Sequence, residues 1–115
     1  MERYEIRAQK VVTGAAECAT ALRQWHGVRA RVWRYHASLS RLAICIFRTD
    51  EPKLAFLIAS TCRFIRGPFS WENNAIEILT DSASSIRVID ESSGFELDCA
   101  SVSIIDEPVE DFEFE

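Results

Sequence analysis

From residue 28 onward the chain is divided into short apolar segments by turn sequences, and this pattern constrains the fold more than any other feature. The segments are rich in Val, Ile, Leu and aromatic residues, a composition typical of strands. They cover residues 28–36, 41–48, 53–61, 75–80, 84–90 and 95–103. The short connections between several of them predict antiparallel hairpins, the first around a four-residue loop, Ala37-Ser38-Leu39-Ser40. We therefore expect a sheet-dominated domain.

The connection Glu91-Ser92-Ser93-Gly94 predicts a register for the last hairpin. If that loop has four residues, Arg87 faces Asp98, while apolar residues face one another on the other side of the ladder. The apolar pairs expected are Val88 with Leu97 and Ile86 with Cys99.

One helix is predicted before the strands, over residues 13–26. Val12, Cys18, Leu22 and other apolar residues recur at helical spacing and form one stripe. Thr13 is the expected N-cap, and Gly27 stands where a left-handed residue after the helix is favoured. Alternation in residues 3–8 predicts a strand ahead of the helix.

These elements predict an α+β domain with one N-terminal helix packed on a twisted, mainly antiparallel sheet. A cystatin-like or half-barrel arrangement would accommodate this order. We expect a single domain over residues 1–105, with 106–115 as an acidic C-terminal tail or edge strand.

Charge is sorted along the chain. Residues 1–80 carry 12 Lys and Arg against 7 Asp and Glu, whereas residues 81–115 carry Arg87 alone against 11 acids. Such an imbalance favours contact with an oppositely charged surface, in the same molecule or in another. The apolar runs are too short to span a bilayer, and no apolar leader precedes the domain, so we expect a cytoplasmic protein without a membrane partner.

The acidic C-terminal region is the first candidate site, as a surface for a basic protein partner. Phe112 and Phe114 would anchor the contact, and carboxylates would supply the charge. The residues assigned to this site are Asp90, Glu91, Glu96, Asp98, Glu110, Asp111, Phe112 and Phe114. Alternatively, the same acids pair with arginine-bearing strands of this protein, and the tail forms an edge strand.

Two further surfaces are candidates for ligand or nucleic-acid contacts. Strand alternation places Arg29, Arg31, Trp33 and Tyr35 on one face, where guanidinium groups and rings suit single-stranded nucleic acid or cation–π pairing within the sheet. The segment 62–71 combines arginines, aromatics and a Gly-Pro turn. Its residues Cys62, Arg63, Arg66 and Trp71 would lie at the mouth of a concave sheet face, or simply close the core.

No catalytic residues, metal site or cofactor are assigned. The sequence has two histidines, no metal-binding Cys/His spacing and no nucleotide-binding glycine motif. Four dispersed cysteines favour buried, reduced thiols, and they are Cys18, Cys45, Cys62 and Cys99.

Our sequence-based hypothesis is a non-enzymatic protein-binding domain, of inhibitor or immunity type, that engages a basic partner through its acidic end. The alternatives are a small-ligand-binding or weakly catalytic domain using the concave sheet face, and single-stranded nucleic-acid binding through the 28–48 hairpin.

Overall fold

The computed structural model describes residues 10–38, 40–48, 53–82 and 84–108. It contains one helix, α1 (Ala15–Arg23). The strands are β1 (Lys10–Thr13), β2 (Arg29–His36), β3 (Arg41–Phe47), β4 (Lys53–Ser60), β5 (Phe64–Arg66), β6 (Ser70–Trp71), β7 (Glu77–Ser82), β8 (Ser85–Asp90), β9 (Phe95–Cys99) and β10 (Ser101–Pro108). The strand predicted at residues 3–8 lies outside the described residues.

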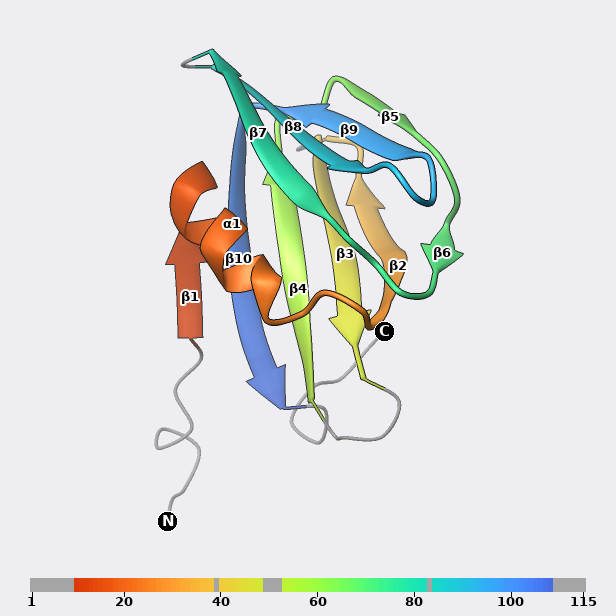
Figure 1. The fold of residues 1–115 in the computed structure, drawn as a ribbon. Helices are drawn as coiled ribbons and strands as arrows, with labels where there is room; N and C mark the ends of the chain where they lie inside the picture. The colour runs from red at the N-terminus through yellow and green to blue at the C-terminus, as the bar shows by residue number, and fades with distance from the viewer. Residues whose placement is uncertain (1–9, 39, 49–52, 83, 109–115) are drawn as a thin grey trace.

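The strands form two antiparallel sheets that pack face to face (Figure 1). Sheet A has the order β1-β10-β4-β3-β2-β6, and sheet B has the order β5-β9-β8-β7. The α+β class is confirmed. The strands form two sheets, however, where one twisted sheet was predicted. The chain changes sheet at Ala100, between β9 and β10, so the continuous strand predicted over residues 95–103 is two strands.

The helix lies beside the sandwich and contacts β7, β10 and β1 (Figure 1). It is shorter than predicted: Gly14, with φ 96°, occupies the N-cap position, so the helix begins at Ala15, and it already ends at Arg23. Thr13, the predicted cap, instead ends β1. Gly27 does adopt the expected positive φ, 93°, although the helix already ends at Arg23.

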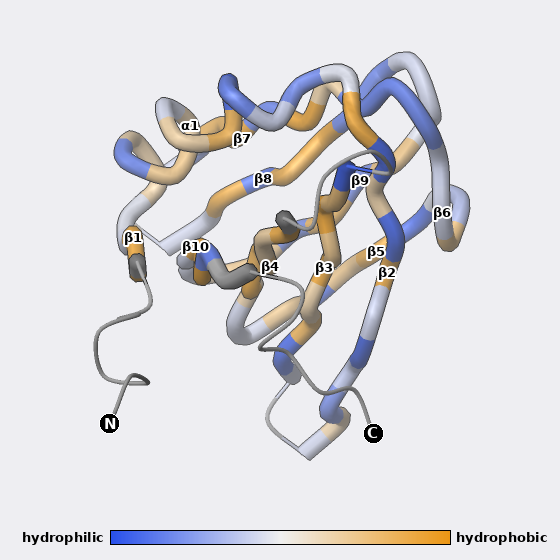
Figure 2. Tube along the Cα trace, turned by 90° about the horizontal axis from the view of Figure 1, so that it is seen from below, coloured by the Kyte–Doolittle hydropathy of each residue, from blue (hydrophilic) through white to orange (hydrophobic). Residues whose placement is uncertain are grey.

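The main core fills the space between the sheets and the helix. Alternate residues of β3, β4 and β10 point inward from sheet A, and Val88, Phe95 and Leu97 meet them from sheet B. Leu22 and Cys18 of α1 complete it at full burial. Figure 2 shows the hydrophobic colour concentrated along β3, β4 and β8.

Both predicted hairpins have the expected pairing. His36 pairs with Arg41 across the 37–40 turn, and the β8–β9 register joins Arg87 to Asp98, Val88 to Leu97 and Ile86 to Cys99. β10 continues to Pro108 as an interior strand between β1 and β4, so residues 106–108 belong to the sheet. Among the described residues, no helix is long and apolar enough to cross a membrane.

Candidate binding surface

A β-bulge in β2 creates a row of basic residues on the outer face of sheet A. Arg31 pairs with Cys45 before the bulge and Arg34 pairs with Ala43 after it, so Trp33 is the extra residue. Because paired residues of antiparallel strands share a face, Arg29, Arg31 and Arg34 lie on the same side. His36 pairs with Arg41, which extends the same side to β3. We call Arg29, Arg31, Arg34 and Arg41 the arginine row.

The bulge also corrects the predicted face. Simple alternation grouped Tyr35 with Arg29 and Arg31, but Tyr35 pairs with the inward-facing Leu42. Arg34 takes its place beside the other arginines. A bulge inserts one residue and reverses the later alternation, which a pattern of period two cannot anticipate.

An apolar strip runs alongside the arginine row, mainly on β3 and β4, with Trp33 of β2 at its border. It is formed by Trp33, Cys45, Phe47, Leu54, Phe56 and Ile58. Cys45 pairs with Phe56 and Phe47 pairs with Leu54, whereas the adjacent pairs Ile44–Leu57 and Ile46–Ala55 enter the main core. The apolar strip therefore faces away from sheet B. Even so, Cys45 is 3% exposed, and Leu54 and Phe56 are each 4% exposed.

Cation–π contacts join the arginine row to the apolar strip. The Arg31 guanidinium carbon lies 5.8 Å from the Trp33 ring centroid and 5.6 Å from that of Phe47. The Arg29 guanidinium carbon lies 6.0 Å from the Phe47 centroid. These contacts hold the positive charges at the border of the apolar surface.

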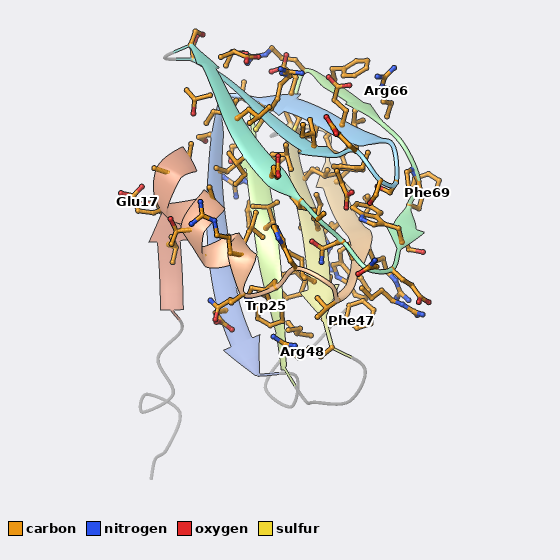
Figure 3. All side chains as sticks on the ribbon, viewed as in Figure 1. Glu17, Trp25, Phe47, Arg48, Arg66 and Phe69 are labelled. Carbon is orange, nitrogen blue, oxygen red and sulfur yellow. The ribbon has the colours of Figure 1, made fainter. Side chains whose placement is uncertain are left out.

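A hollow of about 440 Å³ opens at one end of this surface, between β2, β3 and the segment after β6. Arg29, Phe47, Arg48 and Glu72 contribute to its wall, and Arg29 forms an ion pair with Glu72. Arg48 lies over the Trp25 ring at 5.3 Å and donates to the Gln24 carbonyl at 3.0 Å. Figure 3 shows Phe47, Arg48 and Trp25 gathered at this end of sheet A.

The residues predicted in the 62–71 segment do not converge on one site. Arg63 donates to the Asp98 carboxylate at 3.2 Å and the Cys99 carbonyl at 3.1 Å, and Arg66 pairs with Glu96 at 3.0 Å. Trp71 is buried and stacks on Phe95, with ring centroids 4.8 Å apart. Phe69 is 81% exposed and points outward near β6, as does Arg66 near β5 (Figure 3).

Asp90 has a structural role that the sequence analysis missed. Its carboxylate is fully buried and accepts hydrogen bonds from Trp71 Nε1 at 2.7 Å, the Ala75 N–H at 2.8 Å and Ser92 Oγ at 2.8 Å. Burial alone would raise the pKa of Asp90, but these hydrogen bonds outweigh it and lower the pKa. An Asp opening the Asp-Glu-Ser-Ser-Gly turn was the available signal, since such residues bond to the backbone two positions onward.

The remaining acids predicted for a partner have other surroundings. Asp98 and Glu96 pair with arginines of sheet B, and Glu91 is exposed in the β8–β9 turn. Glu110, Asp111, Phe112 and Phe114 lie outside the described residues. The described residues contain eleven Lys and Arg against ten Asp and Glu, whereas residues 109–115 contain four acids and no base.

The described thiols include three that lie in buried positions. Burial raises the pKa of the Cys18, Cys45 and Cys99 thiols to about 11, which disfavours the nucleophilic thiolate. His26 Nε2 lies 2.9 Å from the Ile76 carbonyl oxygen. Within the described ranges, no group of three or more His, Cys, Asp or Glu residues could hold a metal ion.

Neither the family models, nor the curated proteins, nor the solved structures contain a significant match to this chain.

Proposed function

We propose that this chain is a non-enzymatic protein-binding domain that recognises an extended acidic and aromatic segment on the outer face of sheet A. The observation that carries the proposal is the apolar strip bordered by the arginine row. Side chains of the strip exclude water, while the row selects negative charge. The strip lies on the side of sheet A opposite its core, and although Cys45, Leu54 and Phe56 are buried, Trp33, Phe47 and Ile58 are only partly buried.

The spacing of the surface favours an extended ligand. Neighbouring strands are about 4.8 Å apart. The apolar strip, mainly on β3 and β4, and the arginine row, mainly on β2, therefore run side by side along the sheet. A ligand segment in extended conformation places successive side chains on opposite sides. Aromatic residues on one side can enter the strip, and acids can reach guanidinium groups that already lie in fixed positions against Trp33 and Phe47.

The proposal is tested with a fluorescently labelled peptide of the chosen chemistry, Pro-Val-Glu-Asp-Phe-Glu-Phe-Glu. Its anisotropy is titrated with the full chain and with a chain ending at Pro108, which retains every described strand. We expect saturable binding to at least the shorter chain. The matched peptides replace both Phe by Ala or every acid by Lys, and both should bind at least tenfold more weakly.

Arg31→Glu supplies the protein-side control, because it reverses charge beside the apolar strip. Arg87→Glu is its matched variant on sheet B, where Arg87 pairs with Asp81 at 3.0 Å. We expect Arg31→Glu to weaken binding of the peptide by at least tenfold and Arg87→Glu to leave the affinity unchanged. Equal effects of the two variants, or no binding by either chain, would refute the proposed surface.

A second candidate function is the engagement of a basic partner through the acidic C-terminal end. Its support is the composition of residues 109–115, four acids and two Phe in seven residues. The acids Glu96 and Asp98 contribute less, because arginines of the same sheet compensate them. Salt-sensitive capture of one basic protein by the full chain, lost with the chain ending at Pro108, would favour this candidate.

Nucleic acid is the alternative ligand of the arginine row. Base stacking would require open ring faces, yet the Arg31 guanidinium already lies over both the Trp33 and the Phe47 rings. A labelled single-stranded oligonucleotide is therefore expected to bind weakly at low salt and not at 200 mM salt. Salt-resistant oligonucleotide binding would replace the peptide proposal.

A further inference from the structure

We propose that this chain forms a two-fold symmetric dimer, in which β5 of one copy pairs antiparallel with β5 of a second copy. Such pairing would join the four-stranded sheet B of each copy into one continuous sheet. The interface lies at the edge of sheet B. It therefore goes beyond the proposed binding surface, which is on the outer face of sheet A.

The first observation is the free edge of β5. This strand pairs with β9 on one side, and no described strand pairs with its other side. Two backbone hydrogen bonds hold the segment around β5 at the margin of the sandwich (Figure 1). Cys62 N–H donates to the Ser40 carbonyl at 2.8 Å, and Val32 N–H donates to the Phe69 carbonyl at 2.7 Å. An edge strand fixed in this way presents backbone groups with which a further strand can pair.

Large apolar side chains flank this edge on both sides of the sheet. Phe64 pairs with Asp98 on the outer face of sheet B, whereas Ile65 pairs with Leu97, which lies in the main core. Phe64 is 47% exposed and Ile65 is 46% exposed. Phe69, which follows β5, is 81% exposed and projects from the same margin (Figure 3). We call Phe64, Ile65 and Phe69 the edge patch. Exposed apolar side chains gathered beside an unpaired strand are typical of an interaction site.

The sequence of β5, Phe64-Ile65-Arg66, is complementary to itself. In a two-fold antiparallel pair centred on Ile65, the two Ile65 residues face each other, and Phe64 of each copy faces Arg66 of the other. The Arg66 guanidinium can then lie over the Phe64 ring of the second copy, and this cation–π contact occurs twice. A pair centred on Arg66 would instead place two arginines opposite each other, which is unfavourable. Charge therefore selects the register centred on Ile65.

The charges around β5 favour a second copy over an acidic segment at this edge. Arg63 pairs with Asp98, and Arg66 pairs with Glu96. The edge is therefore close to electrically neutral, and an acidic segment would meet the two carboxylates of β9. A second copy brings the same balanced charges together with the same apolar side chains. Because Gly67-Pro68 ends the strand and proline has no N–H to donate, the ladder is short and the dimer should be reversible.

Sedimentation equilibrium of the full chain tests the dimer. Over about a hundredfold range of protein concentration, we expect the mean mass to rise from that of one chain toward that of two. Ile65→Lys places two like charges at the centre of the interface and should weaken self-association at least tenfold. Leu79→Lys, on the opposite edge strand β7, is the matched control and should leave self-association unchanged. The mass of one chain at every concentration, or equal effects of the two variants, would overturn the proposal.

A pair of substitutions at Phe64 tests the register. Phe64→Glu and Phe64→Lys both remove the ring, but they place opposite charges facing Arg66 of the second copy. We expect the Glu variant to associate at least tenfold more tightly than the Lys variant, and this difference should narrow in about 0.5 M NaCl. Circular dichroism checks that both variants are folded. Equal association of the two variants, or tighter association of the Lys variant, would overturn the pairing centred on Ile65.

Two crossed measurements separate this inference from the proposed function. Arg31→Glu should leave self-association unchanged, and Ile65→Lys should leave binding of the labelled peptide unchanged. Failure to dimerise would thus overturn the dimer and leave the peptide surface on sheet A standing. If the chain does not self-associate and Ile65→Lys abolishes peptide binding, an extended segment and not a second copy occupies the edge of β5. That result would overturn the dimer.

Discussion

Charged residues are arranged differently on the outer faces of the two sheets. On sheet B, arginines and acids alternate across neighbouring strands, as in the pairs Arg63–Asp98 and Arg66–Glu96. On sheet A, the arginine row borders a buried apolar strip, and Arg29 of the row pairs with Glu72. The comparison teaches that the arginines on sheet B are compensated by acids of the same sheet, whereas Arg29 and Arg31 on sheet A lie against aromatic rings.

The largest effect that sharpens this comparison is expected from Phe56→Ala. Phe56 is buried, so the substitution removes a buried ring and should lower the free energy of unfolding by about 3–5 kcal/mol. Leu79→Ala is the matched variant on the outer face of sheet B, where Leu79 is 36% exposed. It should cost about 1 kcal/mol. Urea unfolding measures both, and similar small losses would contradict the difference between the faces.

Asp90→Ala tests an acid inside the sandwich against an acid on its surface. The substitution leaves the buried Trp71 Nε1–H and the Ala75 N–H without their acceptor. Each unsatisfied donor costs about 1–3 kcal/mol, so we expect a loss of about 2–4 kcal/mol in urea unfolding. Asp98→Ala breaks a partly exposed pair with Arg63 and should cost less than about 1 kcal/mol. A larger loss for Asp98→Ala would reverse the assignment.

The pH dependence of the free energy of unfolding tests the carboxylate of Asp90 separately. The pKa of Asp90 is lowered in the folded protein from its ordinary value of 3.8, so the folded state binds fewer protons than the unfolded state. Its contribution to stability is therefore complete above pH 3.8 and is lost as the pH falls through the lower, folded pKa. Urea unfolding between pH 2.5 and pH 5 should show this loss, and Asp90→Asn should flatten it. An unchanged slope in that variant would assign the dependence to other acids.

A smaller effect is expected from Arg31→Ala. It removes the guanidinium contacts with the Trp33 and Phe47 rings and should lower the free energy of unfolding by about 1 kcal/mol. Arg31→Lys, which retains a charge and a long stem, should recover part of this loss. If Arg31→Lys lowers the free energy of unfolding as much as Arg31→Ala does, planar stacking of the guanidinium group, and not its charge, provides the stabilisation.

The smallest effect is expected on sheet B. Arg66→Ala removes a single pair with Glu96 from a side chain that is 69% exposed. We expect a change below about 0.5 kcal/mol, and smaller still in 0.5 M NaCl, since exposed pairs are screened. A loss above about 1 kcal/mol would mean that the charges of sheet B act as a network, which would weaken the contrast with sheet A.

Local features of the fold were accessible from the sequence. The turns at residues 37–40 and 91–94 gave both hairpins, and the β8–β9 register followed from matching apolar residues with apolar residues. The helix was overextended because apolar spacing continues to Trp25, whose side chain is buried without being helical. Division into two sheets depends on contacts between distant strands, such as β4 with β10, and alternation within one strand carries no record of them.

The candidate site was only partly predictable. Arg29, Arg31 and Trp33 were identified as one surface, and the structure brings them together with Phe47. The apolar strip was missed because β3 reads as apolar on both faces, which equally describes a strand buried between two layers. Asp90 was assigned to a surface because acids are rarely buried, and its partner Trp71 lies 19 residues away.

The interior position of β10 has a consequence for how the molecule is made. β1 pairs along one side of β10 and β4 along the other, so residues 10–13 have no ladder to join until residues 101–108 leave the ribosome. Sheet A is therefore completed only after β10 has been synthesised. Until then the edge of β4 stays open to other chains, and nascent polypeptides that present residues 10–100 should depend on holding chaperones.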